Sequence, residues 1–298
     1  MLNALTIDVE DYFQVNAFAR RIRREDWGEY PLRVEKNTHR ILNMLDEFSV
    51  RATFFVLGWI AERVPSLISE IHVRGHEISC HGYGHELIYA IGPEAFRRDI
   101  RKAKQILEDI CGERVCGYRA PSYSITKQSL WALDILIEEG FTYDSSVFPV
   151  YHDTYGIPGA PRFPCVIERQ AGSITEFPLS VYPIRMCGRE YRLPIAGGGY
   201  LRLFPAELLR RGIATINEKE NQPAVLYFHP WEIDPDQPRI KAGVKSTFRH
   251  YLNLKSTEGK LRHIIGKGHF GNMKDTLEIL RHRSGNLPIV SGATLENA

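Results

Sequence analysis

The stretch "RATFFVLGWIAERVPSLISEIHVRGHEISCHGYGHE" at residues 51–86 predicts a strand, a helix and a second strand in close succession. Its first part, "RATFFVL" at 51–57, ends in four consecutive apolar residues, which is typical of a strand buried on both faces. A helical pattern follows near 59–73, and "HEISC" at 76–80 is again typical of a strand. Because parallel sheets are built from such units, the stretch predicts an α/β fold.

The same alternation continues in both directions along the chain. We expect further strands at 4–9, 116–120, 141–147, 174–183 and 224–233. We expect further helices at 36–48, 93–110, 126–139, 205–219 and 272–283. Two sections break the rhythm, because 149–175 is rich in proline and predicts a long excursion, while 234–269 is polar and predicts irregular structure.

The number and order of these elements define the expected fold class. About seven parallel strands with intervening helices indicate a distorted or incomplete (β/α) barrel, or else an open doubly wound sheet. We expect a single domain over residues 1–298, with a core at 4–233 and an irregular carboxyl-terminal extension at 234–298 packed on it.

The composition is that of an ordinary globular protein. The chain has 298 residues, of which 43% are apolar and 25% are charged. No apolar run approaches the roughly 20 residues that a transmembrane helix needs. A net charge of +2 argues against a dedicated nucleic-acid surface. The amino terminus has no basic leader, so we expect a cytoplasmic location.

The cysteines indicate reduced thiols rather than a disulfide-stabilised fold or a zinc-ribbon fold. Their number is odd, and none has the paired C-x-x-C spacing of a structural zinc site. The five are Cys80, Cys111, Cys116, Cys165 and Cys187.

Polar side chains gather where the predicted strands end. In α/β folds the chemistry lies at the carboxyl ends of the strands, so these side chains are the candidate site residues. Alternation along the first strand puts Asp8 and Glu10 on the same face. The full set is Asp8, Glu10, His81, His85, Arg119, Asp144 and His229.

The segment "HGYGH" at 81–85 predicts a loop with two imidazoles. Its two glycines would cost a helix about 2 kcal/mol relative to alanine, so a loop after the strand is expected. Two histidines and one carboxylate form a familiar zinc set that leaves coordination positions open. The alternative is that His81 and His85 only cap a turn through hydrogen bonds.

Four motifs together resemble the polysaccharide deacetylase family, which shares the NodB homology domain. They are "TIDVED" at 6–11, "HGYGH" at 81–85, "RAPSYS" at 119–124 and "YFHPWE" at 227–232. The resemblance covers roughly residues 4–233. The spelling "IDVEDYF", the segment "GGGYLR" at 197–202 and the long extension are similar to the subgroup associated with exosortase-type exopolysaccharide loci.

The resemblance implies a role for most of the candidate residues. It makes Asp8 the general base, Arg119 its orienting partner, His81 and His85 metal ligands, and His229 the general acid. It also implies a divalent metal, Zn²⁺ first among them, and an N-acetylated glycan or lipid-linked oligosaccharide as substrate.

Two departures from the family pattern leave alternatives open. The family has adjacent aspartates in its first motif, whereas here Val9 follows Asp8. Strand alternation favours Glu10 as the third ligand, and a bulge would present Asp11 instead. The aspartate that tunes the catalytic histidine is missing from its usual motif. Asp144 is the nearest candidate, with hydrogen bonding to backbone as its alternative role.

The function expected from this resemblance is metal-dependent removal of acetyl groups from N-acetylhexosamine residues during exopolysaccharide biosynthesis. A cytoplasmic enzyme would meet such a substrate at the inner face of the membrane. One alternative is hydrolysis of other C–N bonds, as in an allantoinase-like cyclic amidase. Another is a non-catalytic glycan-binding protein.

Overall fold

The computed structural model describes residues 1–186 and 189–298, so Cys187 lies outside the described residues. Seven neighbouring strands form a continuous parallel sheet in the order β10-β1-β2-β3-β4-β5-β7. The expected α/β class with about seven parallel strands is therefore confirmed. The strands are β1 (Asn3–Val9), β2 (Thr53–Val56), β3 (Glu77–Cys80), β4 (Gly117–Tyr118), β5 (Tyr143–Asp144), β7 (Gly172–Glu176) and β10 (Val225–Phe228).

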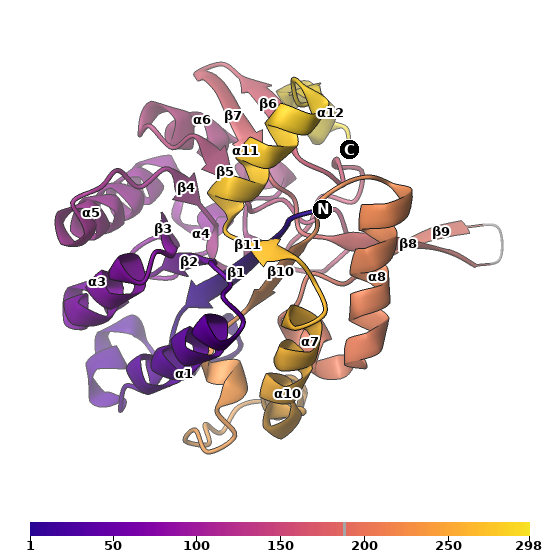
Figure 1. Cartoon of the computed structure of the whole chain (residues 1–298). Helices are drawn as coiled ribbons and strands as arrows, with labels where there is room; N and C mark the ends of the chain where they lie inside the picture. The colour runs from indigo at the N-terminus through magenta and orange to yellow at the C-terminus, as the bar shows by residue number, and fades with distance from the viewer. Residues whose placement is uncertain (187–188) are drawn as a thin grey trace.

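Five further strands extend or flank this sheet. β6 (Cys165–Arg169) pairs antiparallel with β7, and β12 (Ile289–Ser291) pairs with β6. The short β11 (Phe270–Gly271) pairs with β1, so residues of the carboxyl-terminal extension join the sheet. β8 (Val181–Met186) and β9 (Arg189–Pro194) form a separate antiparallel pair that projects from the body in Figure 1.

Helices surround the sheet in Figure 1. They are α1 (Val34–Glu47), α2 (Gly58–Arg63), α3 (Pro65–Val73), α4 (Ile88–Ile91), α5 (Pro93–Cys111), α6 (Trp131–Glu138), α7 (Gly199–Leu203), α8 (Ala206–Lys219), α9 (Val244–Tyr251), α10 (Leu254–Ile265), α11 (Met273–Ser284) and α12 (Gly292–Glu296). Short 3₁₀ turns lie between them: η1 (Asn16–Phe18), η2 (Arg24–Glu29), η3 (Pro121–Tyr123), η4 (Lys127–Ser129) and η5 (Pro230–Ile233).

Two expectations about helices were wrong in detail. The single helix expected near 59–73 is divided into α2 and α3, because Pro65 has no N–H for a continuing helix and instead opens the second one. Residues 234–269 are not irregular, since they contain α9 and α10. In α10 the buried Leu254, Leu261 and Ile265 keep a helical spacing among a polar majority that obscures the pattern.

Segments that follow β7 in the chain lie beside β10, which is at the other end of the seven-stranded parallel sheet. The N–H of Val225 donates to Ser180 Oγ at 2.7 Å, and Gly197 bridges to Tyr227. Gly197 has a φ of +134°, and a Cβ there would lie 1.8 Å from the Tyr227 carbonyl oxygen. Gly197 thus permits a close approach of two backbone segments that any side chain would prevent.

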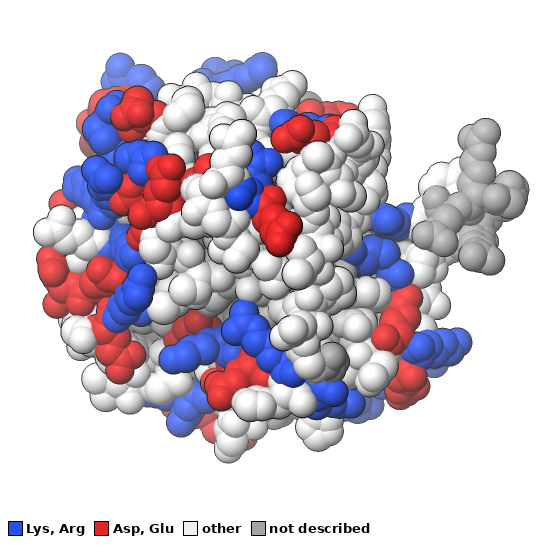
Figure 2. Space-filling model, turned by 90° about the horizontal axis from the view of Figure 1, so that it is seen from above, with Lys and Arg blue, Asp and Glu red and all other residues white. Residues whose placement is uncertain are grey.

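The surface carries both signs of charge. Figure 2 shows Lys and Arg interspersed with Asp and Glu over the face it presents. Among the described residues, no helix combines the length and apolarity needed to cross a bilayer.

The contact at Gly197 generates a stability prediction. We expect Gly197→Ala to lower the free energy of unfolding by about 1–3 kcal/mol, because the backbone is left-handed and the methyl group has no room. Gly243→Ala is the matched control, since Gly243 has a φ of −60° and open space around it. Urea denaturation of both variants measures the difference, and equal stabilities would contradict the prediction.

Candidate metal and catalytic site

Three predicted ligands meet at the carboxyl ends of β1 and β3. Glu10, His81 and His85 are all buried, and each offers one ligand atom within 4.8 Å of the other two. Glu10 Oε2 lies 2.7 Å from His85 Nε2. The structure thus brings together two imidazoles and one carboxylate, the donor set typical of an open zinc site.

The surroundings of His81 prepare it as a ligand. Its Nδ1 lies 2.8 Å from the carbonyl oxygen of Arg119, which fixes the ring with Nε2 toward the cluster. Burial lowers the pKa of His81 to about 4, so the imidazole is neutral near pH 7. A neutral imidazole with a free nitrogen lone pair is what a metal requires.

The Glu10 carboxylate is held by one oxygen and leaves the other for a cation. Trp231 Nε1 donates to Oε1 at 3.1 Å, whereas the buried Oε2 accepts no well-aligned hydrogen bond from the described residues, and its near neighbour, His85 Nε2 at 2.7 Å, is itself a candidate ligand atom. Burial acts to raise the pKa of Glu10, but His85 and His229 outweigh it and lower the pKa to about 2. A buried anionic oxygen without such a hydrogen bond fits a divalent metal ion.

Asp11, the other candidate for the third ligand, is engaged elsewhere. Its Oδ2 accepts from the N–H groups of Arg33 and Val34 at 2.7 and 2.9 Å, where α1 begins. Its Oδ1 accepts from the N–H of Tyr12 at 2.8 Å. The structure therefore groups Glu10, and not Asp11, with His81 and His85.

The "HGYGH" loop is held by a partly buried carboxylate of α5, that of Asp99. Asp99 accepts from the N–H of Tyr83 at 2.7 Å and from the N–H of Gly84 at 3.0 Å. Gly82 has a φ of +73°, and a Cβ there would lie 2.7 Å from Asp99 Oδ2. On the carbonyl side, Arg24 donates to the oxygens of Gly84 and His85. The glycines of the motif thus allow the loop to be held from two sides.

Asp8 is paired with a fully buried arginine. Arg119 Nη1 donates to Asp8 Oδ1 at 2.7 Å and to Thr6 Oγ1 at 2.8 Å. The remaining donors reach the backbone oxygen and hydroxyl of Ser145 at 3.1 and 2.9 Å. The other Asp8 oxygen lies 3.9 Å from His229 Nε2, so Asp8 faces the centre of the site.

His229, at the carboxyl end of β10, completes the group. Its Nε2 lies 3.4 Å from Glu10 Oε1, and its Nδ1 lies 2.9 Å from Glu232 Oε2. Burial alone would lower the pKa of His229, but the carboxylates of Glu10 and Glu232 raise it to about 9. Without a metal, His229 is therefore protonated near neutral pH.

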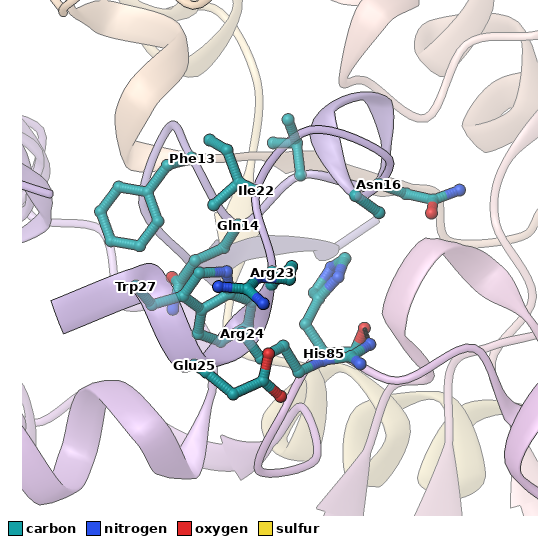
Figure 3. A pocket seen from close by; sticks show the side chains of 11 residues that line it. Phe13, Gln14, Asn16, Ile22, Arg23, Arg24, Glu25, Trp27 and His85 are labelled. Carbon is teal, nitrogen blue, oxygen red and sulfur yellow. Dashed lines mark hydrogen bonds between the residues drawn. The ribbon is translucent and has the colours of Figure 1, made fainter. Parts of the chain in front are cut away.

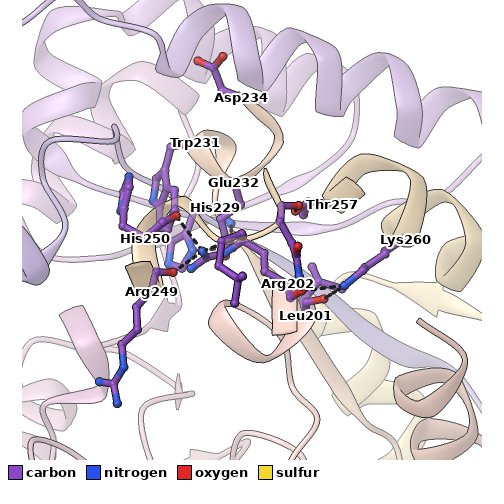
Figure 4. Close-up of polar contacts among 12 residues, drawn as sticks. Leu201, Arg202, His229, Trp231, Glu232, Asp234, Arg249, His250, Thr257 and Lys260 are labelled. Atoms are coloured by element: carbon purple, nitrogen blue, oxygen red, sulfur yellow. Dashed lines mark hydrogen bonds and ion pairs between the residues drawn. The ribbon is translucent and has the colours of Figure 1, made fainter. Parts of the chain in front are cut away.

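Glu232 and Arg202 are site residues that the sequence reasoning missed. Glu232 is buried, and its second oxygen accepts from Arg202 Nε at 2.6 Å, as Figure 4 shows. A local signal was present in "HPWE". Proline at the first position of a helical turn and an acidic residue two positions later are typical of a capping arrangement. In it, the acidic side chain accepts a hydrogen bond from the N–H of the residue before the proline. The N–H of His229 does donate to Glu232 at 3.0 Å.

Asp144 has different partners. It lies directly opposite Glu176 across β5 and β7, and Ser146 Oγ donates to its Oδ1 at 2.5 Å. Burial raises the pKa of Asp144 to about 6 and that of Glu176 well above its usual value. In the described part of the chain, the carboxylate hydrogen-bonded to His229 is Glu232.

A cavity of about 260 Å³ adjoins the cluster. His85 forms one part of its wall, and the segment between β1 and α1 forms the rest (Figure 3). Phe13, Ile22 and Trp27 supply apolar surface, and polar side chains such as Gln14 lie among them. The cavity therefore offers mixed polar and aromatic surface beside a candidate ligand.

Two family models match the chain in succession. Residues 26–137 match the model described as polysaccharide deacetylase, and residues 145–278 match a domain of unknown function, DUF3473. The resemblance to the polysaccharide deacetylases is therefore confirmed over residues 26–137. The deacetylase match includes His81, His85 and Arg119, while His229 lies in the second region.

Curated relatives align with part of the chain. A peptidoglycan-N-acetylglucosamine deacetylase of Bacillus cereus is 34% identical over 98 residues, covering 33% of this chain and 36% of the relative. A chitooligosaccharide deacetylase of Sinorhizobium fredii is 31% identical over 99 residues, covering 33% of this chain and 44% of the relative. The chain thus spans well under half the length of these relatives.

Solved structures share the fold over nearly the whole chain. A structure from Mycobacterium smegmatis described as a polysaccharide deacetylase has a TM-score of 0.63 at 24% identity, covering 96% of this chain and 92% of that one. The Puue allantoinase has a TM-score of 0.59 at 14% identity, covering 95% and 91%. At these identities the likeness concerns the fold alone.

The hydrogen bonds between Asp99 and the "HGYGH" loop generate a prediction about metal binding. We expect Asp99→Asn to weaken zinc binding about 10- to 100-fold, because one of the two loop N–H groups would then face an amide donor. Asp109→Asn, at an exposed position on the same helix, is the control. Competition with a chromogenic chelator measures both affinities. Equal affinities in the two variants would show that Asp99 does not position the ligands.

Proposed function

We propose that this protein is a metal-dependent N-deacetylase that acts on N-acetylhexosamine residues of a polysaccharide or lipid-linked oligosaccharide. The observation that carries the proposal is the joint presence of three functions in one buried site. A candidate cation cluster lies between a carboxylate paired with arginine and a histidine paired with glutamate. The match of residues 26–137 to the polysaccharide deacetylase model supports the same reaction.

Glu10, His81 and His85 would hold the cation in the proposed enzyme. Two nitrogen donors and one oxygen donor make Zn²⁺ the first choice, although other divalent cations accept the same set. When bound there, such a cation polarises the acetyl carbonyl and increases the acidity of water.

The side chains around the cluster supply the proton transfers. Asp8 takes the proton from the attacking water, and the ion pair with Arg119 holds its carboxylate in place. His229 then gives a proton to the departing amine from Nε2. Glu232 holds the Nδ1 proton, which fixes the tautomer and keeps the ring charged until the transfer. Acetate and a free amino sugar leave the site.

The substrate class is inferred from chemistry and from relatives. The relatives named above act, by their names, on N-acetylglucosamine in peptidoglycan and on chitooligosaccharides. The cavity beside His85 has the mixed aromatic and polar wall that a sugar ring needs. We place the reaction in exopolysaccharide biosynthesis, in the cytoplasm at the inner face of the membrane.

Acetate release tests the proposal directly. We expect the purified, zinc-supplied protein to release acetate from N-acetylglucosamine oligosaccharides and a chelator to abolish the release. Allantoin is assayed in parallel, because the shared fold leaves a cyclic amidase as the competing reaction. Turnover of allantoin alone would overturn the proposal, and so would glycan binding without any acetate release.

Two histidine variants separate metal binding from proton transfer. We expect His81→Ala to lose both bound zinc and activity, because one of three ligands is removed. We expect His229→Ala to retain zinc and lose about 10²- to 10⁴-fold in kcat, the usual contribution of a general acid. Elemental analysis and steady-state kinetics measure the two effects. Full zinc occupancy in His81→Ala would remove this residue from the proposed ligand set.

The pH profile tests the role of Glu232. The Glu232 carboxylate raises the pKa of His229, and the reaction needs His229 protonated. Glu232→Gln should therefore lower kcat by about 10²-fold and move the alkaline limb of the profile to lower pH. Asp144→Asn should leave that limb in place, because Asp144 pairs with Glu176 instead. If the alkaline limb shifted in Asp144→Asn but not in Glu232→Gln, Asp144 and not Glu232 would be the carboxylate that supports His229.

A further inference from the structure

The helix α9 and the segments beside it carry an exposed surface that is both basic and apolar, here called the α9 rim. It consists of Arg239, Lys241, Val244, Phe248, Arg249 and Lys255, all of which are exposed. No aspartate or glutamate occurs in the sequence between Asp236 and Glu258. The rim thus combines positive charge with apolar side chains in a stretch of sequence that has no acidic residue.

The two apolar residues of the rim point to solvent rather than to the core. Val244 is 88% exposed and Phe248 is 64% exposed. They are four positions apart in α9, so they lie on the same side of the helix, one turn from each other. Exposed apolar side chains of this size, flanked by cations, are the composition of a helix that lies on a membrane surface.

The opposite side of α9 is anchored in the catalytic site. His250 is buried, and its ring stacks on Trp231 with centroids 4.2 Å apart. Trp231 in turn stacks on His229 at 5.2 Å. Arg202 joins the carbonyl oxygens of Arg249 and His250, at 2.5 and 2.8 Å, to Glu232. Any partner bound to the outer side of α9 is therefore held close to the reaction centre.

Figure 4 shows that side chains from α9 point in different directions. The His250 ring lies with Trp231 and His229, whereas the Arg249 side chain extends away from this cluster. The segment that carries α9 follows directly from η5 at the carboxyl end of β10, on the face of the barrel where the site opens. The α9 rim belongs to the catalytic face.

We propose that the α9 rim docks the protein on an anionic lipid bilayer, with the catalytic site facing the membrane. The basic side chains match the phosphates of anionic head groups, each contributing a several-fold gain in binding, and Val244 and Phe248 enter the interface between head groups and acyl chains. An anionic glycan fits this surface less well, because the protruding side chains of Val244 and Phe248 offer it neither a groove nor hydrogen bonds. The inference rests on the proposed function in one respect: a membrane would present the lipid-linked substrate to the catalytic site.

Vesicle co-sedimentation tests this docking with the full chain. We expect binding to vesicles of 30% phosphatidylglycerol in phosphatidylcholine, weak binding to pure phosphatidylcholine, and loss of binding at high salt. The double variants Val244→Ser with Phe248→Ser, and Arg239→Glu with Lys241→Glu, should each bind at least tenfold more weakly. Val73→Ser with Lys274→Glu is the matched control, since both residues are exposed and lie where β3 and α11 begin, at the opposite end of the barrel.

Failure of the wild type to bind anionic vesicles would overturn the proposal, and so would equal binding by the rim variants and the control. Rim-dependent binding to a polyanionic glycan such as polygalacturonate, without vesicle binding, would assign the surface to a glycan instead. The rim variants should deacetylate short N-acetylglucosamine oligosaccharides at the wild-type rate. Loss of that activity in every protein, wild type included, would reject the proposed function and leave the vesicle result standing.

Discussion

The buried ion pair between Arg119 and Asp8 is the interaction on which the rest of the structure depends. A guanidinium taken fully out of water costs several kcal/mol unless all of its donors are satisfied. Here the donors reach β1 through Thr6 and Asp8, and they reach the end of β5 through Ser145. The strands must therefore keep their relative positions, or an uncompensated charge is left inside the barrel.

The same arginine connects the proposed proton acceptor with the candidate cation cluster. Its side chain fixes Asp8, while its carbonyl oxygen fixes the ring of His81. The face of the guanidinium lies over Phe55 of β2 at 4.1 Å, so the central strands enclose it. A single residue thus determines both the orientation of a carboxylate and the tautomer of an imidazole.

Much of this arrangement could be predicted from the sequence, because it depends on local periodicity. The strands around Asp8, His81 and His229 are short and rich in apolar residues, and the polar candidate residues lie where each strand ends. The choice between Glu10 and Asp11 was not visible locally, since it depends on hydrogen bonds from Arg33 and Val34 to Asp11. The Arg202 contact likewise joins segments that are thirty residues apart.

The stacked rings behind the site have a consequence for its geometry. One indole, that of Trp231, both donates to Glu10 and lies against the ring of His229. The spacing between the candidate ligand Glu10 and the proposed proton donor His229 is therefore set by one rigid plane rather than by two independently rotating side chains. A substitution that tilts this plane would displace both groups at once.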